Sequence, residues 1–141
     1  MDLGRMVDEL ERDEGLRLKP YRDSLGVLTI GVGRNLDAVG ISRGEAYFLL
    51  HNDVERAVAD VDKWLPWWTG LDEPRQRVLV NMAFNLGIKR LLGFQRFLAA
   101  AQAGRYEDAA TEMLASAWAG QVGPRAQRLA AMMRGGAPQG G

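Results

Sequence analysis

Two carboxylates and one hydroxyl near the N-terminus have a spacing that suits the cleavage of a glycosidic bond. Glu14 closes a helix-like segment, Asp23 follows nine residues later, and Thr29 comes six residues further, inside a glycine-rich run. One carboxyl can protonate the leaving oxygen, while the other activates water or stabilises the positive charge that develops on the sugar. Asp23 could instead serve only as a turn residue, because aspartate readily caps its own turn.

The segment before Glu14 is expected to form a short amphipathic helix over residues 1–12. Its apolar residues recur at helical spacing on one face: Leu3, Met6, Val7 and Leu10. Gly15 is a suitable helix stop, which leaves Glu14 on the last turn. The C-terminal end of a helix carries partial negative charge and disfavours an anion there. This position therefore favours the protonated carboxyl that a general acid requires.

The glycine-rich run predicts a β-hairpin, and a long helix follows it. Residues 27–32 have strand propensity, and Leu25-Gly26 favours a turn before them. Gly31 and Gly33 alternate, which frees one strand face for close approach by a ligand or another backbone. A capping box, Ser42-x-x-Glu45, then begins a helix whose apolar stripe continues to Pro66.

The rest of the chain predicts shorter helices. Asp72 is the expected N-cap of a helix that ends at Gly87, and this helix is apolar enough to be the central core helix. Three more helices are expected over Phe94–Ala103, Tyr106–Ala115 and Pro124–Arg134. The predicted fold class is mostly α (α+β), with one small β-hairpin lobe near the N-terminus and a flexible tail over residues 135–141.

Composition narrows the chemistry. The 141-residue chain contains no cysteine, which excludes disulfides and thiol catalysis, and His51 is its one histidine, without a nucleophile-elbow pattern to accompany it. We therefore expect no metal and no cofactor. The acidic N-terminus has no signal-peptide pattern, and no apolar run is long enough to span a bilayer.

Charge is unevenly distributed although the formal net charge is zero. Residues 1–73 hold nine Lys or Arg against fifteen Asp or Glu, whereas residues 74–141 hold nine against three. This asymmetry predicts an acidic face near the candidate acids and a basic face elsewhere that can meet a polyanion.

Several segments together resemble the phage-type lysozymes. The N-terminal part of the match is DEGLRLK at 13–19, YRD at 21–23 and TIGVG at 29–33. The C-terminal part is NMAFNLG at 81–87, GF at 93–94, YEDAA at 106–110, SAW at 116–118 and the stretch 121–128. The resemblance covers roughly residues 3–134, and the Glu–x8–Asp–x5–Thr spacing followed by IGVG is its most specific part.

The resemblance implies one lysozyme-like domain over residues 1–134, with two lobes and a cleft between them. Residues 13–41 would form the active-site lobe, 42–66 the connecting helix and 72–134 the helical lobe. The family cleaves the β-1,4 bond between N-acetylmuramic acid and N-acetylglucosamine. By resemblance, Glu14 is the general acid, and Asp23 and Thr29 assist the attacking water. Inversion at the anomeric carbon is expected, with carboxyls roughly 6.5–9.5 Å apart.

Further positions take their expected roles from the same resemblance. Arg125 aligns with an arginine that pairs with the catalytic glutamate, and Phe84 aligns with a phenylalanine of the cleft. Asn85 and Trp118 match a polar–indole contact beside the site. Positions with saccharide contacts in the family carry different residue types here: Asn35, Phe97 and Glu112.

Two departures from the family are evident. Arg34 stands where the family's typical enzyme has a histidine that pairs with an aspartate, and Asp53 occupies the place of that aspartate. We therefore predict an Arg34–Asp53 ion pair. Only six residues, 36–41, separate the glycine-rich strand from the next helix, which predicts a reduced β lobe and a more open cleft.

Two other functions remain open at this point. A lytic transglycosylase would use Glu14 alone and release an anhydro sugar, and a silent peptidoglycan-binding module would need neither acid. The expected partner is the glycan strand of peptidoglycan, without nucleic acid or stable membrane insertion, and the protein is expected to be a monomer. The resemblance implies synthesis in the host cytoplasm and action on the cell wall after holin-type release.

Overall fold

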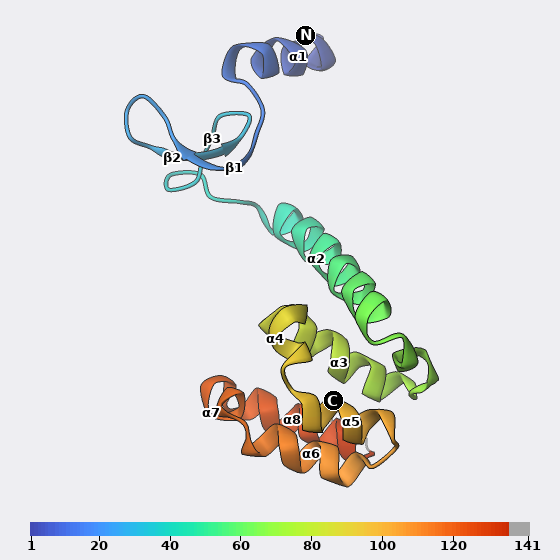
Figure 1. The fold of residues 1–141 in the computed structure, drawn as a ribbon. Helices are drawn as coiled ribbons and strands as arrows, with labels where there is room; N and C mark the ends of the chain where they lie inside the picture. The colour runs from blue at the N-terminus through green and yellow to red at the C-terminus, as the bar shows by residue number, and fades with distance from the viewer. Residues whose placement is uncertain (136–141) are drawn as a thin grey trace. The chain divides into compact units, whose positions relative to one another are not determined.

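A computed structural model gives the fold of the chain and describes residues 1–135 (Figure 1). The chain divides into two compact units, Met1–Leu49 and Leu50–Gly141. The division falls inside one long helix, α2 (Arg43–Trp64). The flexible tail predicted for residues 135–141 lies outside the described residues, apart from Gly135.

The first unit begins with the helix α1 (Leu3–Glu14). Asp2 is its N-cap, and the Asp2 carboxylate accepts a hydrogen bond of 3.0 Å from the backbone N–H of Arg5. Gly15 ends the helix with a φ of 77°, and its N–H donates to the carbonyl of Glu11. The predicted helix and its glycine stop are therefore confirmed, and Glu14 is its last residue.

A three-stranded antiparallel sheet follows α1, in the order β1-β2-β3. Its strands are β1 (Arg17–Arg22), β2 (Leu28–Gly31) and β3 (Arg34–Asn35). Thr29 in the middle of β2 lies opposite Tyr21 on one side and Asn35 on the other. The sequence predicted only a hairpin, on the strand propensity of residues 27–32, and gave no strand over residues 17–22, which contain Pro20. Proline is tolerated in β1 because β1 is an edge strand and its register shifts between Arg17 and Tyr21.

The capping box at the start of α2 is present as predicted. The backbone N–H of Ser42 donates to Oε1 of Glu45 at 2.8 Å, and the N–H of Glu45 donates to the Ser42 hydroxyl at 3.1 Å. Each side chain satisfies a backbone donor that the helix itself leaves free. The helix runs for 22 residues and is followed by a 3-10 turn over Pro66–Gly70.

The second unit contains the C-terminal part of α2 and six further helices. They are α3 (Glu73–Leu86), α4 (Ile88–Leu92), α5 (Gln95–Gln102), α6 (Tyr106–Ala115), α7 (Ala117–Val122) and α8 (Pro124–Arg134). The four longer helices match the predicted segments, whereas α4 and α7 are too short for periodicity to detect. Asp72 occupies the N-cap position of α3 as predicted, but its carboxylate binds Arg75 at 3.0 Å and does not cap the helix.

The hydrophobic core lies in the second unit, and α3 contributes to it as predicted. Val78, Leu79 and Met82 of α3 are fully buried. The helix α6 packs against α5 and α8 (Figure 1), where small side chains such as Ala101 and Ala109 permit close approach. The mostly helical fold with a small N-terminal sheet confirms the predicted fold class. Within residues 1–135, no helix combines the length and apolar character that crossing a bilayer demands.

Candidate active site

Glu14 lies at the C-terminal end of α1, and its side chain is exposed. The side chain rests against Gly33 in the turn between β2 and β3. A Cβ placed on Gly33 would lie 3.0 Å from Oε2 of Glu14 and 3.1 Å from its Cδ. The turn of the sheet therefore bounds one side of the candidate acid.

Asp23 lies in the turn that joins β1 to β2, and its side chain holds that turn. Oδ1 of Asp23 accepts hydrogen bonds from the backbone N–H groups of Leu25 at 2.8 Å and Val27 at 2.9 Å. The turn role considered from the sequence is therefore present. Both bonds use Oδ1, and within residues 1–49 no hydrogen bond or ion pair reaches Oδ2.

Thr29 is the buried polar residue of the sheet, with 3% of its surface exposed. Its hydroxyl donates to the backbone carbonyl of Val27 at 2.8 Å. The same carbonyl accepts the backbone N–H of Asp23 at 3.0 Å. Asp23 and Thr29 are thus fixed to one residue, Val27, whose N–H and carbonyl both take part.

The prediction that Arg34 pairs with Asp53 is wrong, because Arg34 has a different partner. Arg34 binds Glu45 through both terminal nitrogens, each at 2.9 Å, and it also donates to the carbonyl of Gly40 at 3.0 Å. Asp53 pairs with Arg56 at 3.4 Å. The capping box explains the difference, because it fixes the Glu45 carboxylate at the start of α2, next to the short loop that follows Arg34.

Glu45 is a carboxylate whose pKa is strongly lowered by its hydrogen bonds. Hydrogen bonding from Arg34, followed by hydrogen bonds from Ser42, lowers the pKa of Glu45 from 4.5 to about 2. The fork of the guanidinium matches the two carboxylate oxygens, which is a geometry that lysine cannot reproduce. The pair fixes the end of the loop over residues 36–41.

Asn35 has a structural role in the same loop. Its side-chain oxygen accepts the backbone N–H of Ala38 at 2.8 Å, and its carbonyl accepts N–H groups from Val39 and Gly40. The side chain therefore closes the turn after β3. Its expected contact with a saccharide remains a prediction.

Phe84 and Arg125 border a groove in the second unit. The groove has a volume of about 420 Å³ and joins an apolar floor to three arginines: Arg77, Arg125 and Arg128. Phe84 is 43% exposed, which leaves its ring free to contact a ligand. Nε and Nη2 of Arg125 donate to Oδ1 of Asn81 at 2.9 and 2.7 Å. Glu14 belongs to the other unit, so its pairing with Arg125 remains a prediction.

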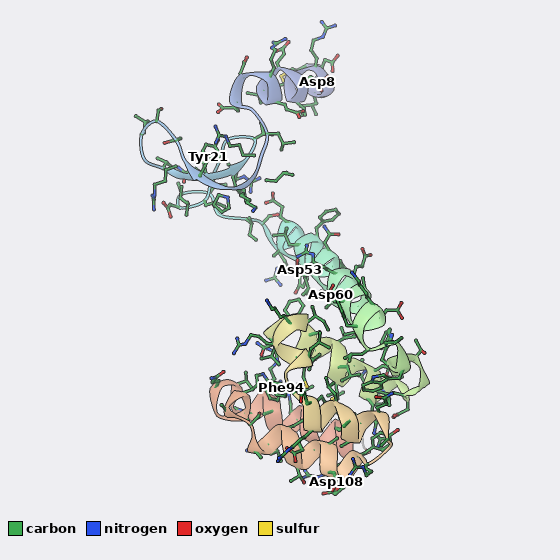
Figure 2. The ribbon with its side chains drawn as sticks, viewed as in Figure 1. Asp8, Tyr21, Asp53, Asp60, Phe94 and Asp108 are labelled. Carbon is green, nitrogen blue, oxygen red and sulfur yellow. The ribbon has the colours of Figure 1, made fainter. Side chains whose placement is uncertain are left out.

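A second groove of about 390 Å³ lies around Phe94, which is labelled in Figure 2. Arg96, Phe97 and Glu112 also line it. Phe97 has 1% of its surface exposed, so nearly all of its ring belongs to the core. Glu112 is more accessible than Phe97, and both expected saccharide contacts remain predictions.

The predicted contact between Asn85 and Trp118 is confirmed. The indole N–H of Trp118 donates to the side-chain oxygen of Asn85 at 2.8 Å. Trp118 also meets the ring of Phe94 edge to face, with ring centres 6.3 Å apart. The indole therefore connects α3 to the wall of the second groove.

Three residues of the site were not assigned a role from the sequence. Gly33 touches Glu14, the backbone of Val27 connects Asp23 to Thr29, and Asn81 orients Arg125. Only the glycine alternation offered a signal, and it pointed to a close approach without naming the partner. Among residues 1–135 there is no cluster of His, Asp and Glu that could hold a metal ion.

Comparison with known proteins assigns the chain to a family. The model of the phage lysozymes matches residues 11–134, which include both acids, the sheet and nearly the whole second unit. The chain belongs to the phage lysozyme family. The match confirms the resemblance that the motifs indicated.

The chain spans a small part of one relative and nearly the whole length of two others. The pre-baseplate central spike protein Gp5 of Enterobacteria phage T4 is 32% identical over 88% of this chain, which spans 26% of that protein. The probable T4-type lysozymes 1 and 2 of Dictyostelium discoideum are 26% and 27% identical, and this chain spans 93% and 94% of their lengths.

Proposed function

We propose that this phage lysozyme hydrolyses the β-1,4 bond between N-acetylmuramic acid and N-acetylglucosamine in peptidoglycan. Its family membership supports a peptidoglycan hydrolase of the muramidase type. The finer assignment rests on the connection of Asp23 and Thr29 through Val27. This connection ties the Asp23 carboxylate, in the turn, and the Thr29 hydroxyl, on β2, to the backbone of one residue.

In this proposal Glu14 is the general acid. Its carboxyl is exposed at the end of α1, where it can reach the oxygen of a leaving sugar. Proton transfer to that oxygen allows the bond to the anomeric carbon to break with an oxocarbenium-like transition state. The Glu14 carboxylate that remains then takes up a proton from solvent, which regenerates the acid for the next turnover.

Asp23 and Thr29 would hold the attacking water by accepting its two hydrogens. Oδ2 of Asp23 takes no hydrogen bond within the first unit, so it can accept one hydrogen and act as general base. The hydroxyl of Thr29 already donates its proton to Val27, so it can only accept from a water molecule. A water held in this way turns a lone pair toward the anomeric carbon.

The second unit supplies features that suit the rest of the substrate. The exposed ring of Phe84 offers an apolar surface to a sugar, and the neighbouring arginines suit the carboxylates of peptidoglycan. Asn81 holds two nitrogens of Arg125, which leaves Nη1 free to bind an anion. Phe84 and these arginines are therefore the proposed substrate-binding groups of the second unit.

Digestion of purified peptidoglycan tests the catalytic assignment. Glu14→Gln should lower kcat by about 10²–10⁴-fold, the usual contribution of a general acid. Asp23→Asn should also be nearly inactive, although the amide oxygen of asparagine can accept the same two N–H bonds and preserve the turn. Circular dichroism and thermal unfolding should therefore match the wild type in both variants. Full lytic activity of Glu14→Gln would refute the proposal.

The masses and configuration of the products separate the three candidate functions. A hydrolase releases sugars with a free reducing end and, with water held opposite the leaving group, inverted configuration. A transglycosylase would release an anhydro product that is lighter by one water, and it would tolerate Asp23→Asn. A binding module would release no soluble fragments at all.

A further inference from the structure

We propose that Gly33 is a positioning residue for the general acid, because the side chain of Glu14 occupies the space that a Cβ at residue 33 would fill. The inference rests on the proposed function, in which Glu14 donates the proton. It assigns to one glycine of the turn between β2 and β3 a role in catalysis that acts through another residue.

The contact involves most of the Glu14 side chain. A Cβ on Gly33 would lie 3.0 Å from Oε2, 3.1 Å from Cδ and 3.2 Å from Cγ of Glu14. Ordinary van der Waals contacts of a Cβ fall between 3.4 and 4 Å. One added methyl group would therefore press on three consecutive atoms at once, and the carboxyl would have to move away.

Neighbouring glycines show that this contact is separate from backbone conformation. Gly15, Gly26 and Gly31 have φ angles of 77°, 79° and 70°, close to the 67° of Gly33. A Cβ on any of those three would meet nothing within 4 Å. A positive φ is sufficient to account for glycine at those three positions. Gly33 has a second reason to be glycine, because the Glu14 carboxyl lies next to it.

The contact matters because little else restrains Glu14 within its own unit. Inside residues 1–49 its carboxylate forms no hydrogen bond and no ion pair. Gly33 therefore limits the directions in which the carboxyl can point. A general acid must lie within about 2.6–3.2 Å of the oxygen that it protonates, so a small displacement reduces the rate.

Gly33→Ala should lower kcat by about fivefold more than Gly31→Ala does, because the contact requires the carboxyl to move by a few tenths of an ångström and misplacement of a reacting group by 1 Å can cost about 100-fold. KM should differ less than about threefold between the two variants, since the displaced carboxyl acts in the chemical step. Gly31→Ala is the matched control, because it adds the same methyl at nearly the same φ without a neighbour.

The experiment compares wild type, Gly33→Ala, Gly31→Ala and Glu14→Gln on purified peptidoglycan and measures kcat and KM separately. The NMR signal of the Glu14 side-chain carboxyl should move in Gly33→Ala alone. Should Gly33→Ala fail to fold, Gly33→Asn and Gly31→Asn replace the pair, because asparagine tolerates a positive φ and still carries a Cβ.

The outcomes separate this inference from the proposed function. Equal kcat losses in the two glycine variants, together with an inactive Glu14→Gln, would overturn the role of Gly33 and leave the function intact. An active Glu14→Gln would overturn the proposed function and the inference with it. A selective kcat loss in the residue-33 variant, with a moved Glu14 signal and an inactive Glu14→Gln, supports both.

Discussion

Replacing Arg34 by alanine should destabilise the protein in a way that depends on pH. Arg34 contacts both carboxylate oxygens of Glu45 at 2.9 Å, through a hydrogen bond to Oε1 and an ion pair with Oε2, and is the main reason that the pKa of Glu45 lies at about 2. A carboxylate whose pKa is lower in the folded state than in the unfolded state stabilises the fold when it is ionised. The pair therefore contributes stability above about pH 4.5, and this stability is lost as pH falls through about 2.

The titration of Glu45 gives the magnitude of the effect. In the wild type its pKa should be about 2, and in Arg34→Ala it should rise toward the ordinary 4.5. It should stop below that value, because the backbone N–H of Ser42 still donates to the carboxylate. The variant should unfold at a lower urea concentration than the wild type at pH 7, and the difference should shrink between pH 4.5 and 2.

NMR titration of the Glu45 carboxyl and urea unfolding at pH 7 and pH 2 test this prediction. Asp53→Asn is the control, because Asp53 pairs with Arg56. It should leave the Glu45 titration unchanged. An equal loss of stability from Arg34→Ala at both pH values would refute the reasoning, as would a wild-type Glu45 that titrates near 4.5.

Two further predictions concern the second unit. Arg75→Ala should lower the free energy of unfolding by about 2–4 kcal/mol in urea unfolding. Arg75 binds the carbonyls of Met133 and Arg134, pairs with Asp72 and stacks on Tyr106. The control is Arg77→Ala, which removes an exposed ion pair and should cost less than about 1 kcal/mol. Asn85→Ala should cost about 1–3 kcal/mol, because it leaves the buried indole N–H of Trp118 without an acceptor. In a Trp118→Phe background, which has no indole N–H, the further loss from Asn85→Ala should be small. A loss as large as in the wild-type background would contradict the account.

The sequence was sufficient for elements whose signals are local. The stripe of α1 with its glycine stop, and the Ser42–Glu45 capping box, each lie within a few consecutive turns of chain. Family resemblance added the pairing of Asn85 with Trp118, which spans 33 residues. Neither source gave the bounds of β1, a strand that contains Pro20 and tolerates it at the edge of the sheet.

The error about Arg34 has a physical origin. The resemblance suggested a partner for Arg34 from the residue types of the family. It did not consider that two acids of α2, Glu45 and Asp53, can compete for the same arginine. Glu45 lies in the first turn, where the capping box already holds its carboxylate toward the loop, whereas Asp53 lies about two turns further along. An arginine that joins a carboxylate already held in place loses less side-chain freedom on pairing.

Asp23 illustrates how a structural role and a catalytic role can belong to one side chain. From the sequence, a turn residue and a catalytic base were alternatives. In the structure the two N–H groups of the turn bind Oδ1 alone, which leaves Oδ2 available for water. The turn then orients the free oxygen, and the carbonyl of Val27 also accepts the hydroxyl of Thr29. A base that must place one water benefits from such fixed geometry, so the turn contributes to the proposed chemistry.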